Sequence, residues 1–389
     1  MKPTTEVPDD PALPGLAAIR TVGLAHAIPA LGLGADPVEL RLCGYTPGER
    51  ATLAVRVGDR QFAVKAYAED PAPEAALYEV LAAAGLAPSG PGTGLANTSG
   101  VRVPPLVAWE RELRVLVTGW LEGRPANRLI KEGQGERAGE LCARWLQRAA
   151  SLPVKIGPPL GSGRILYRAG EWVATLRAAD PGLGRAASAL ARVLANTQPT
   201  SHTPRLVHGT FYARHVLDLG DGPGVIDWQR FGHGPLELDA GMFLATVWRS
   251  GRRNEAVAAQ ATRAERAFLA GTRGLLDERA VAWYRAAALL RLAGHVKVVS
   301  RRRPDWQART LVALREAARL AEGAAQSDLV VRAGAPAFSR VSAALELVLQ
   351  ALSTRPATPQ ELEQIRRLLE EAKEHKPGRI DDVNDTDRA

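Results

Sequence analysis

The chain has few cysteines and no long apolar run, and both absences narrow the classes of protein it can be. Its two cysteines, Cys43 and Cys142, lie far apart in the 389 residues, which excludes a disulfide framework and a cysteine-based metal site. No run of about 18 apolar residues occurs, so no segment is predicted to span a membrane. The first 35 residues lack the pattern of a signal peptide. We therefore expect a soluble protein of the reducing cytoplasm.

Lysine is also scarce. The 50 basic residues comprise 43 arginines and 7 lysines against 42 acidic residues, which gives a formal net charge of +8. Such a balance is compatible with binding to nucleic acid, a membrane surface or an anionic ligand. No arginine block exceeds three residues, which favours a general preference for arginine over a dedicated basic patch. The hydrophobic content of 46% and the charged content of 24% are ordinary for a globular protein.

The first third of the chain predicts a small antiparallel sheet with one helix. Alternating apolar and polar residues separated by Gly- and Pro-containing turns predict about five strands. A helix over 73–84, ended by Gly85, follows the third strand. The predicted strands are 38–43, 51–57, 61–67, 103–109 and 113–118.

Beyond residue 120, long helices rich in Ala, Leu and Arg dominate. One hairpin interrupts them, with strands over 215–219 and 224–228 and a turn over 220–223. That turn would pair Leu217 with Ile226 and Val216 with Asp227. A helical pair is predicted over 338–374. The other predicted helices are 126–150, 171–195, 237–250, 254–270, 277–297 and 306–322.

Lys65 is the one lysine between residues 3 and 130, and it lies in an apolar predicted strand, A-V-K-A-Y. It either faces solvent or needs a buried partner, and strand alternation does not decide between the two. At about 100° per residue, Glu74 of the next helix lies on the edge of the apolar face, whereas Glu79 points away. Glu74 is therefore the expected partner, as in the lysine–glutamate pair of protein kinases.

Four of the seven histidines fall between residues 202 and 233. In the predicted hairpin, the loop from His208 to His215 converges on Asp227, and a carboxylate after an apolar strand is suited to a divalent cation. A second interpretation makes His208, His215, Asp227 and His233 a transition-metal site, since two histidines and a carboxylate suit iron or zinc.

Taken together, these segments resemble the aminoglycoside phosphotransferase family of kinase-like enzymes. The matching stretches are A-V-K-A-Y, P-E-A-A-L-Y-E-V-L-A-A-A-G-L, W-L-E-G-R-P, the H-G loop, V-I-D-W and L-D-A-G-M-F-L-A, in family order over about 38–320. The resemblance implies an α+β, two-lobed protein-kinase-like fold. A small antiparallel sheet with one helix would form the N-lobe, and helices would form most of the larger C-lobe.

The resemblance also implies an ATP- and Mg²⁺-dependent phosphotransferase. Lys65 would orient the nucleotide phosphates, Glu74 would hold Lys65, and Asp227 would chelate the magnesium. The turn G-Y-T-P-G-E-R would cover the nucleotide, although it is a poor match to a glycine-rich phosphate loop.

Other roles follow from the same resemblance. Val117, Gly119 and Trp120 would belong to the hinge that meets adenine. His208 would pack the catalytic loop, and Asp239 would tie that loop to the following helix. The implied division of the chain is a leader with an N-terminal helix or loop (1–37, loose over 1–15), a nucleotide-binding N-lobe (38–120), a helical C-lobe (121–325), a helical extension (326–376) and a disordered tail (377–389).

The chain departs from the family at two catalytic positions. Thr210 stands where the family has its catalytic aspartate, and His215 stands where it has an asparagine metal ligand. A threonine is no base near neutral pH, and a general base contributes about 10²–10⁴-fold to typical rates. Neutral imidazole is also a poorer magnesium ligand than an amide oxygen. Slow transfer to a small hydroxylated metabolite is one hypothesis, and a pseudokinase that binds nucleotide or a protein partner is the other.

Nucleic acid and an aminoglycoside are two further candidate ligands. The run R-R-R at 301–303 with Trp306 is compatible with nucleic-acid binding, but no nucleic-acid-binding module accompanies it, so a solvated helix end is favoured. A polycationic aminoglycoside is not favoured as the acceptor, because such a ligand suits an acidic cleft and this lobe is rich in arginine.

Overall fold

The computed structural model describes residues 7–34, 36–87, 100–199, 203–300 and 304–332. The chain divides into two units, residues 1–328 and 329–389, and nearly all of the described residues belong to the first. The predicted helical pair over 338–374, the tail and the arginine run at 301–303 lie outside the described residues. None of the described helices is long and apolar enough to cross a membrane.

A five-stranded antiparallel sheet forms the N-terminal part, as the alternation in the sequence predicts. Its spatial order is β1-β2-β3-β5-β4, so β3 lies at the centre. Lys65 of β3 pairs with Thr52 of β2 on one side and Leu116 of β5 on the other. The strands are β1 (Val38–Thr46), β2 (Arg50–Val57), β3 (Arg60–Tyr67), β4 (Leu106–Glu110) and β5 (Val115–Gly119).

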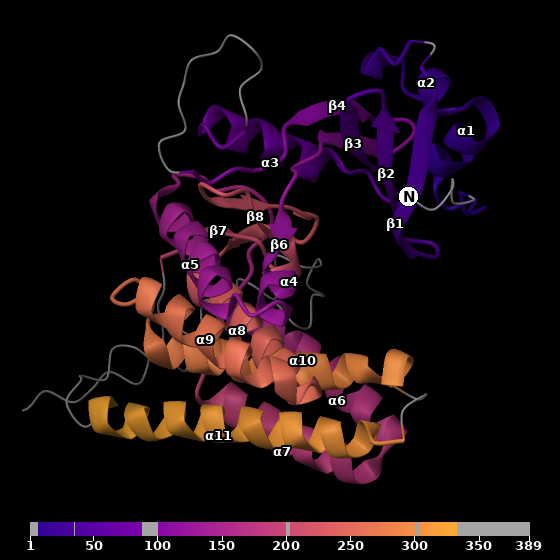
Figure 1. Cartoon of the computed structure of the whole chain (residues 1–389). Helices are drawn as coiled ribbons and strands as arrows, with labels where there is room; N and C mark the ends of the chain where they lie inside the picture. Colours follow the sequence, from indigo (N-terminus) through magenta and orange to yellow (C-terminus); the bar gives the residue numbers. More distant parts are fainter. Residues whose placement is uncertain (1–6, 35, 88–99, 200–202, 301–303, 333–389) are drawn as a thin grey trace, which may run out of the picture. The chain divides into compact units, whose positions relative to one another are not determined.

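Helices cover both faces of this sheet (Figure 1). On one face, α1 (Pro14–Val22) packs with α2 (Leu24–Ala27) and a 3₁₀ turn (Pro29–Leu31) against apolar side chains of β2, β3 and β5. On the other lies α3 (Ala72–Ala83), whose buried residues pack around Leu116. Because side chains alternate along β3, Val64 belongs to the first core and Lys65 faces α3.

The predicted loose leader over 1–15 is wrong where the structure describes it. Leu13 is fully buried in the core beneath α1. The carboxylate of Asp10 accepts hydrogen bonds from the Gly48 amide at 2.8 Å and the Tyr45 hydroxyl at 3.0 Å. This carboxylate therefore holds the turn between β1 and β2, where a positive φ of 70° makes glycine suitable at Gly48.

Eight of the described helices follow β5, and two of the predicted long helices are each two helices. The one over 126–150 breaks near Gly133, whose φ is 90°. The one over 171–195 breaks at Asp180, which caps a new helix beginning at Pro181. The helices are α4 (Ala126–Lys131), α5 (Gly135–Ser151), α6 (Ser162–Ala179), α7 (Pro181–Asn196), α8 (Leu236–Arg253), α9 (Glu255–Gly271), α10 (Glu278–Ser300) and α11 (Trp306–Arg332).

The predicted register of the hairpin is wrong by two residues. Val216 pairs with Val225 and Leu217 with Gly224, because the turn is the tight loop around Gly220 and Asp221, closed from Leu219 to Gly222. The strands are accordingly short, β8 (Val216–Asp218) and β9 (Pro223–Val225), and β6 (Arg124–Pro125) pairs with β8. Asp227 thus lies beyond the end of β9.

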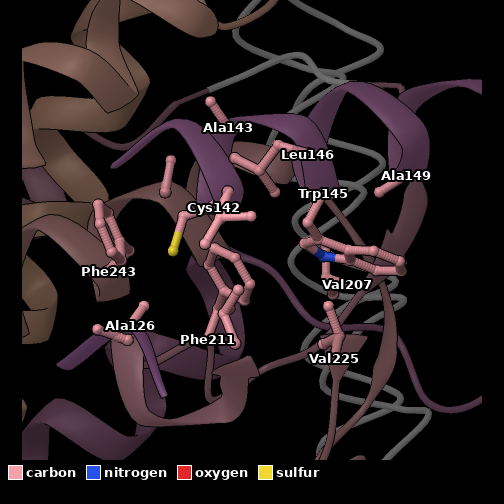
Figure 2. Packing of buried hydrophobic residues seen from close by; sticks show 14 of the residues in the cluster. Ala126, Cys142, Ala143, Trp145, Leu146, Ala149, Val207, Phe211, Val225 and Phe243 are labelled. Atoms are coloured by element: carbon pink, nitrogen blue, oxygen red, sulfur yellow. The ribbon is translucent and has the colours of Figure 1, made fainter. Parts of the chain in front are cut away.

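A dense aromatic core supports the segments around this hairpin. Trp145 of α5 packs edge-on against Trp228 with ring centroids 5.2 Å apart. Figure 2 shows Trp145 beside Val207 and Val225, with Phe211 and Phe243 lining the same core. Val207 ends β7 (Arg205–Val207), which pairs with β10 (Gly232–Gly234). The residues that follow β7 and β9 are therefore anchored to a closely packed apolar core.

Candidate active site

Lys65 and Glu74 form a buried ion pair on the inner face of the sheet. Nζ of Lys65 lies 2.7 Å from Oε1 of Glu74, and both side chains are almost completely buried. Tyr67 donates its hydroxyl proton to the other oxygen of Glu74 at 2.7 Å. Burial by itself disfavours the ammonium, but the carboxylate of Glu74 outweighs it and raises the pKa of Lys65 above its ordinary value. The contact expected from helix geometry is therefore present.

The loop after β7 is fixed from below by Asp239 of α8. Its fully buried carboxylate accepts the backbone N–H groups of His208 at 2.6 Å and Gly209 at 2.9 Å. Gly209 has a φ of 73°, and a Cβ there would collide with the carbonyl oxygen of Arg230. Glycine is therefore required at 209. The contacts of Asp239 agree with the structural role that the resemblance implies for it, which is to tie this loop to the following helix.

The hydrogen bonds of His208 set its tautomer. Nε2 faces the Ile226 carbonyl oxygen at 2.9 Å and so carries the proton. Nδ1 is then an acceptor, and it lies 3.3 Å from the hydroxyl of Thr210. Burial lowers the pKa of His208 below its ordinary value, so the ring is neutral near pH 7. The hydroxyl of Thr210 is thus turned to a neutral imidazole.

His215 and Asp227 face each other across the end of the hairpin. Nδ1 of His215 donates to the Thr210 carbonyl at 2.9 Å, which leaves Nε2 unprotonated and 3.2 Å from Oδ2 of Asp227. Burial lowers the pKa of His215 to about 3, so the ring is neutral at physiological pH. Two lone-pair atoms at this distance repel each other unless a cation lies beside them.

Asp227 contacts both a charged and a polar side chain of the site. Its Oδ1 lies 3.8 Å from Nζ of Lys65 and accepts a hydrogen bond from the side chain of Gln229. Burial opposes ionisation of Asp227, but the nearby ammonium of Lys65 outweighs it and holds the pKa of the carboxyl below its ordinary range. Its φ of 70° is rare for a residue other than glycine, and such backbone strain is typical of functional positions.

A first cavity of about 520 Å³ opens between the sheet and these loops. Lys65 and Thr118 of the sheet line one side of it. His215, Asp227 and Gln229, which flank the hairpin, line the other. The last residues of β1, 43–46, form another wall, where Cys43 has a free thiol.

The predicted hinge residues divide between this cavity and the core. Gly119 and Trp120 line the cavity, and Trp120 is partly exposed. Val117 is not among the residues that line it, and its place in the adenine hinge stays a prediction. Strand alternation accounts for its absence from the lining: Thr118 faces the cavity, so Val117 faces the core beneath α1 and is fully buried.

A second cavity, of about 170 Å³, lies against the same loop and was not predicted. Gly209, Thr210 and Arg230 line it, together with side chains of α6, α8 and α10. Its basic residues are Arg164, Arg168, Arg230, Arg291 and His295. A signal was present in the sequence, since Arg164 and Arg168, and likewise Arg291 and His295, are spaced four apart and share a helix face.

The transition-metal interpretation finds no support in the described part of the chain. No group of three or more His, Cys, Asp or Glu residues there could hold a metal ion together. His233 instead contacts the Gly157 carbonyl through Nδ1 at 2.8 Å, and His208 is engaged at both ring nitrogens. What remains is the two-residue pair of His215 and Asp227.

Several solved structures resemble the chain at low sequence identity. A thermostable mutant of aminoglycoside phosphotransferase APH(4)-Ia, in complex with ADP and hygromycin B, is 14% identical, with 79% of this chain and 97% of that one covered and a TM-score of 0.53. Another mutant of that enzyme, with AMP-PNP and hygromycin B, is 13% identical over 78% and 96%, with a TM-score of 0.52. At these identities the likeness establishes the kinase-like fold alone.

A choline/ethanolamine kinase family protein from Mesorhizobium loti is 18% identical, with 78% of this chain and 92% of that one covered and a TM-score of 0.48. No curated protein is significantly similar to the chain in sequence. The model of the phosphotransferase enzyme family, APH, matches residues 46–284, which is more than half of the chain. The chain therefore belongs to the APH phosphotransferase enzyme family and has its two-lobed, kinase-like α+β fold.

Proposed function

We propose that the chain binds ATP in the first cavity and transfers its γ-phosphoryl group to a hydroxyl of a small molecule in the second. The observation that supports this most strongly is the wall the two cavities share. Gly209, Thr210 and Arg230 border the second cavity, while His215 and Asp227 of the same two segments border the first. A donor on one side and an acceptor on the other would meet at this loop, as in-line transfer requires.

In this proposal Lys65 orients the phosphates, because it is a buried ammonium held by Glu74 and facing the cavity. Gly119 and Trp120 form the end of the cavity that would receive adenine, and Trp120 offers an aromatic surface there. The related solved structures hold ADP and AMP-PNP, which supports an adenine nucleotide as the ligand.

The pair of His215 and Asp227 fits a divalent cation. Nε2 and Oδ2 are 3.2 Å apart, both carry lone pairs, and both line the cavity proposed for the phosphates. A bound cation would neutralise phosphate charge there. The sequence suggests Mg²⁺, but a nitrogen donor suits Mn²⁺ better than it suits Mg²⁺. We therefore propose that the site accepts either ion and favours Mn²⁺.

Transfer in this site is expected to be slow. Thr210 replaces the carboxylate that would accept the hydroxyl proton, and the described lining of the second cavity contains no Asp or Glu. The base in contact with the Thr210 hydroxyl is Nδ1 of His208, and burial lowers the pKa of His208. Positioning and charge stabilisation dominate phosphoryl transfer, so the chemistry is weakened but not abolished.

The test is turnover of γ-labelled ATP with Mn²⁺ or Mg²⁺ and a set of small hydroxyl compounds. We expect slow, acceptor-dependent label transfer that disappears in Lys65→Ala. Absence of label transfer above the Lys65→Ala background for every acceptor would overturn the proposal of catalysis.

The second candidate is a pseudokinase that binds nucleotide without transferring phosphate. Thr210 and His215 favour it, since each replaces a group that the family uses in the reaction. It predicts stabilisation by nucleotide, only weakly dependent on the cation, with no acceptor-dependent turnover. Robust turnover by the wild-type chain would reject it.

A further inference from the structure

The second cavity carries a concentration of positive charge. Arg164 and Arg168 reach it from α6, Arg291 and His295 from α10, and Arg230 from the loop that follows Asp227. Apolar side chains that include Trp172 and Met242 line the remainder. No carboxylate appears in the described lining, so the cavity has the charge of a site for an anion.

These charges are poorly balanced within the described part of the chain. Arg168 pairs with Glu171 at 2.8 Å on the exposed surface of α6, whereas no described acid forms an ion pair with Arg164 or Arg230. Burial, and then the neighbouring Arg168 and Arg230, lower the pKa of Arg164. Burial, and then Arg291 and Arg168, lower the pKa of His295. Arg164, Arg230 and His295 are exposed, so solvent screens part of this repulsion, and an anionic ligand would relieve the rest.

We propose that the second cavity binds the anionic group of the acceptor, which is therefore a small hydroxylated compound bearing a phosphate or carboxylate. The inference rests on the proposed function in that it calls this ligand the acceptor, but the binding itself does not depend on transfer. Arginine suits both anions, because its planar guanidinium donates two parallel hydrogen bonds to either.

The position of the charges agrees with an acceptor. Gly209 and Thr210 form one part of the wall, and the arginines of α6 and α10 form another. An anionic group held by the arginines would leave a hydroxyl free to approach Thr210 at the phosphoryl-transfer position. The same charges would repel a polycationic aminoglycoside, so the chain would differ from the relative that was solved with hygromycin B.

Binding in the absence of nucleotide tests the inference. Glucose 6-phosphate, gluconate, glucose and hygromycin B are titrated calorimetrically at low salt into the wild type and into Arg164→Gln/Arg230→Gln. Arg56→Gln is the matched control, because Arg56 is exposed on β2 and lines neither cavity. We expect at least one of the two anions to bind and its dissociation constant to rise by at least about tenfold in the double variant.

The outcomes separate this inference from the proposed function. Tighter binding of glucose or hygromycin B than of either anion overturns the inference, as does an anion affinity equal in the wild type and the double variant. Loss of anion binding in Lys65→Ala but not in Arg164→Gln/Arg230→Gln would assign the anion to the first cavity, which also overturns it. Anion binding without ATP turnover supports the inference and contradicts catalysis. ATP turnover with neutral acceptors alone supports catalysis and contradicts the inference.

Discussion

The ammonium of Lys65 lies 3.8 Å from Oδ1 of Asp227. The two groups come from the central strand of the sheet and from the loop beyond β9, and they face the same cavity. Glu74 pairs with Lys65, and the side chain of Gln229 donates a hydrogen bond to Asp227, so each charged group has a polar partner of its own. A cation and a carboxylate placed in this way can bind the two sides of a metal–nucleotide complex.

Replacing Lys65 with Ala should weaken nucleotide binding by at least about tenfold, since a charged phosphate contact is removed. The same change leaves the buried carboxylate of Glu74 without its cation, which should lower the free energy of unfolding by about 3–5 kcal/mol. Isothermal titration and urea unfolding measure the two effects. Lys155→Ala is the control, because Lys155 is exposed and should change stability by less than about 0.5 kcal/mol. Equal nucleotide affinity in both variants would contradict the role of Lys65.

Introducing a carboxylate with Thr210→Asp should increase turnover, because it supplies a proton acceptor beside the second cavity. A general base contributes about 10²–10⁴-fold in typical enzymes, so a gain of at least about tenfold is expected. The measurement is acceptor-dependent ADP release. Thr210→Asn is the control, since it has nearly the same shape without the charge. If the aspartate variant is no faster than the asparagine variant, the missing base is not what limits the chain.

Changing His215 to Asn should move the cation preference from Mn²⁺ towards Mg²⁺ by roughly tenfold, because an amide oxygen replaces a ring nitrogen. The quantity to measure is the ratio of nucleotide affinities with the two ions, in the variant and in the wild type. An unchanged ratio would show that His215 does not contact the cation.

The stability of the chain should depend on pH through Asp239. Burial raises the pKa of this carboxyl to about 7, despite two backbone N–H donors. Its pKa is thus higher in the folded than in the unfolded chain, so its stabilising effect is present at about pH 4 and decreases towards pH 7. The free energy of unfolding, relative to Asp239→Asn, should fall over this interval by at most about 1.4 kcal/mol per pH unit. Urea unfolding at pH 5, 6 and 7 checks this, and a constant difference between the two proteins would contradict it.

The sequence was sufficient for features governed by local periodicity. Strand alternation predicted the individual strands, and helix geometry placed Glu74 on the helix face that could meet Lys65, because both patterns depend on residues close in the chain. The hairpin register was not predictable in this way. Gly220, Gly222 and Pro223 are all turn formers, so the sequence allows two registers, and hydrogen bonding from Leu219 to Gly222 selects the tighter one.

The second cavity could not be predicted from the sequence, for a different reason. Arg164, Arg230 and Arg291 come from α6, the loop after β9 and α10, and only tertiary packing brings them together. Spacing of four residues identifies a shared helix face but not the neighbour that the face meets. Val117 illustrates the same limit, because resemblance gave its place in the chain but not the side of the strand on which it lies.

The most direct test of the central claim is the affinity for AMP-PNP with and without Mn²⁺ or Mg²⁺, in the wild type and in Lys65→Ala. We predict binding to the wild type that strengthens when the cation is added and weakens by at least about tenfold in the variant. No binding by the wild type, or the same affinity in both proteins, would contradict a nucleotide site at Lys65 and Asp227.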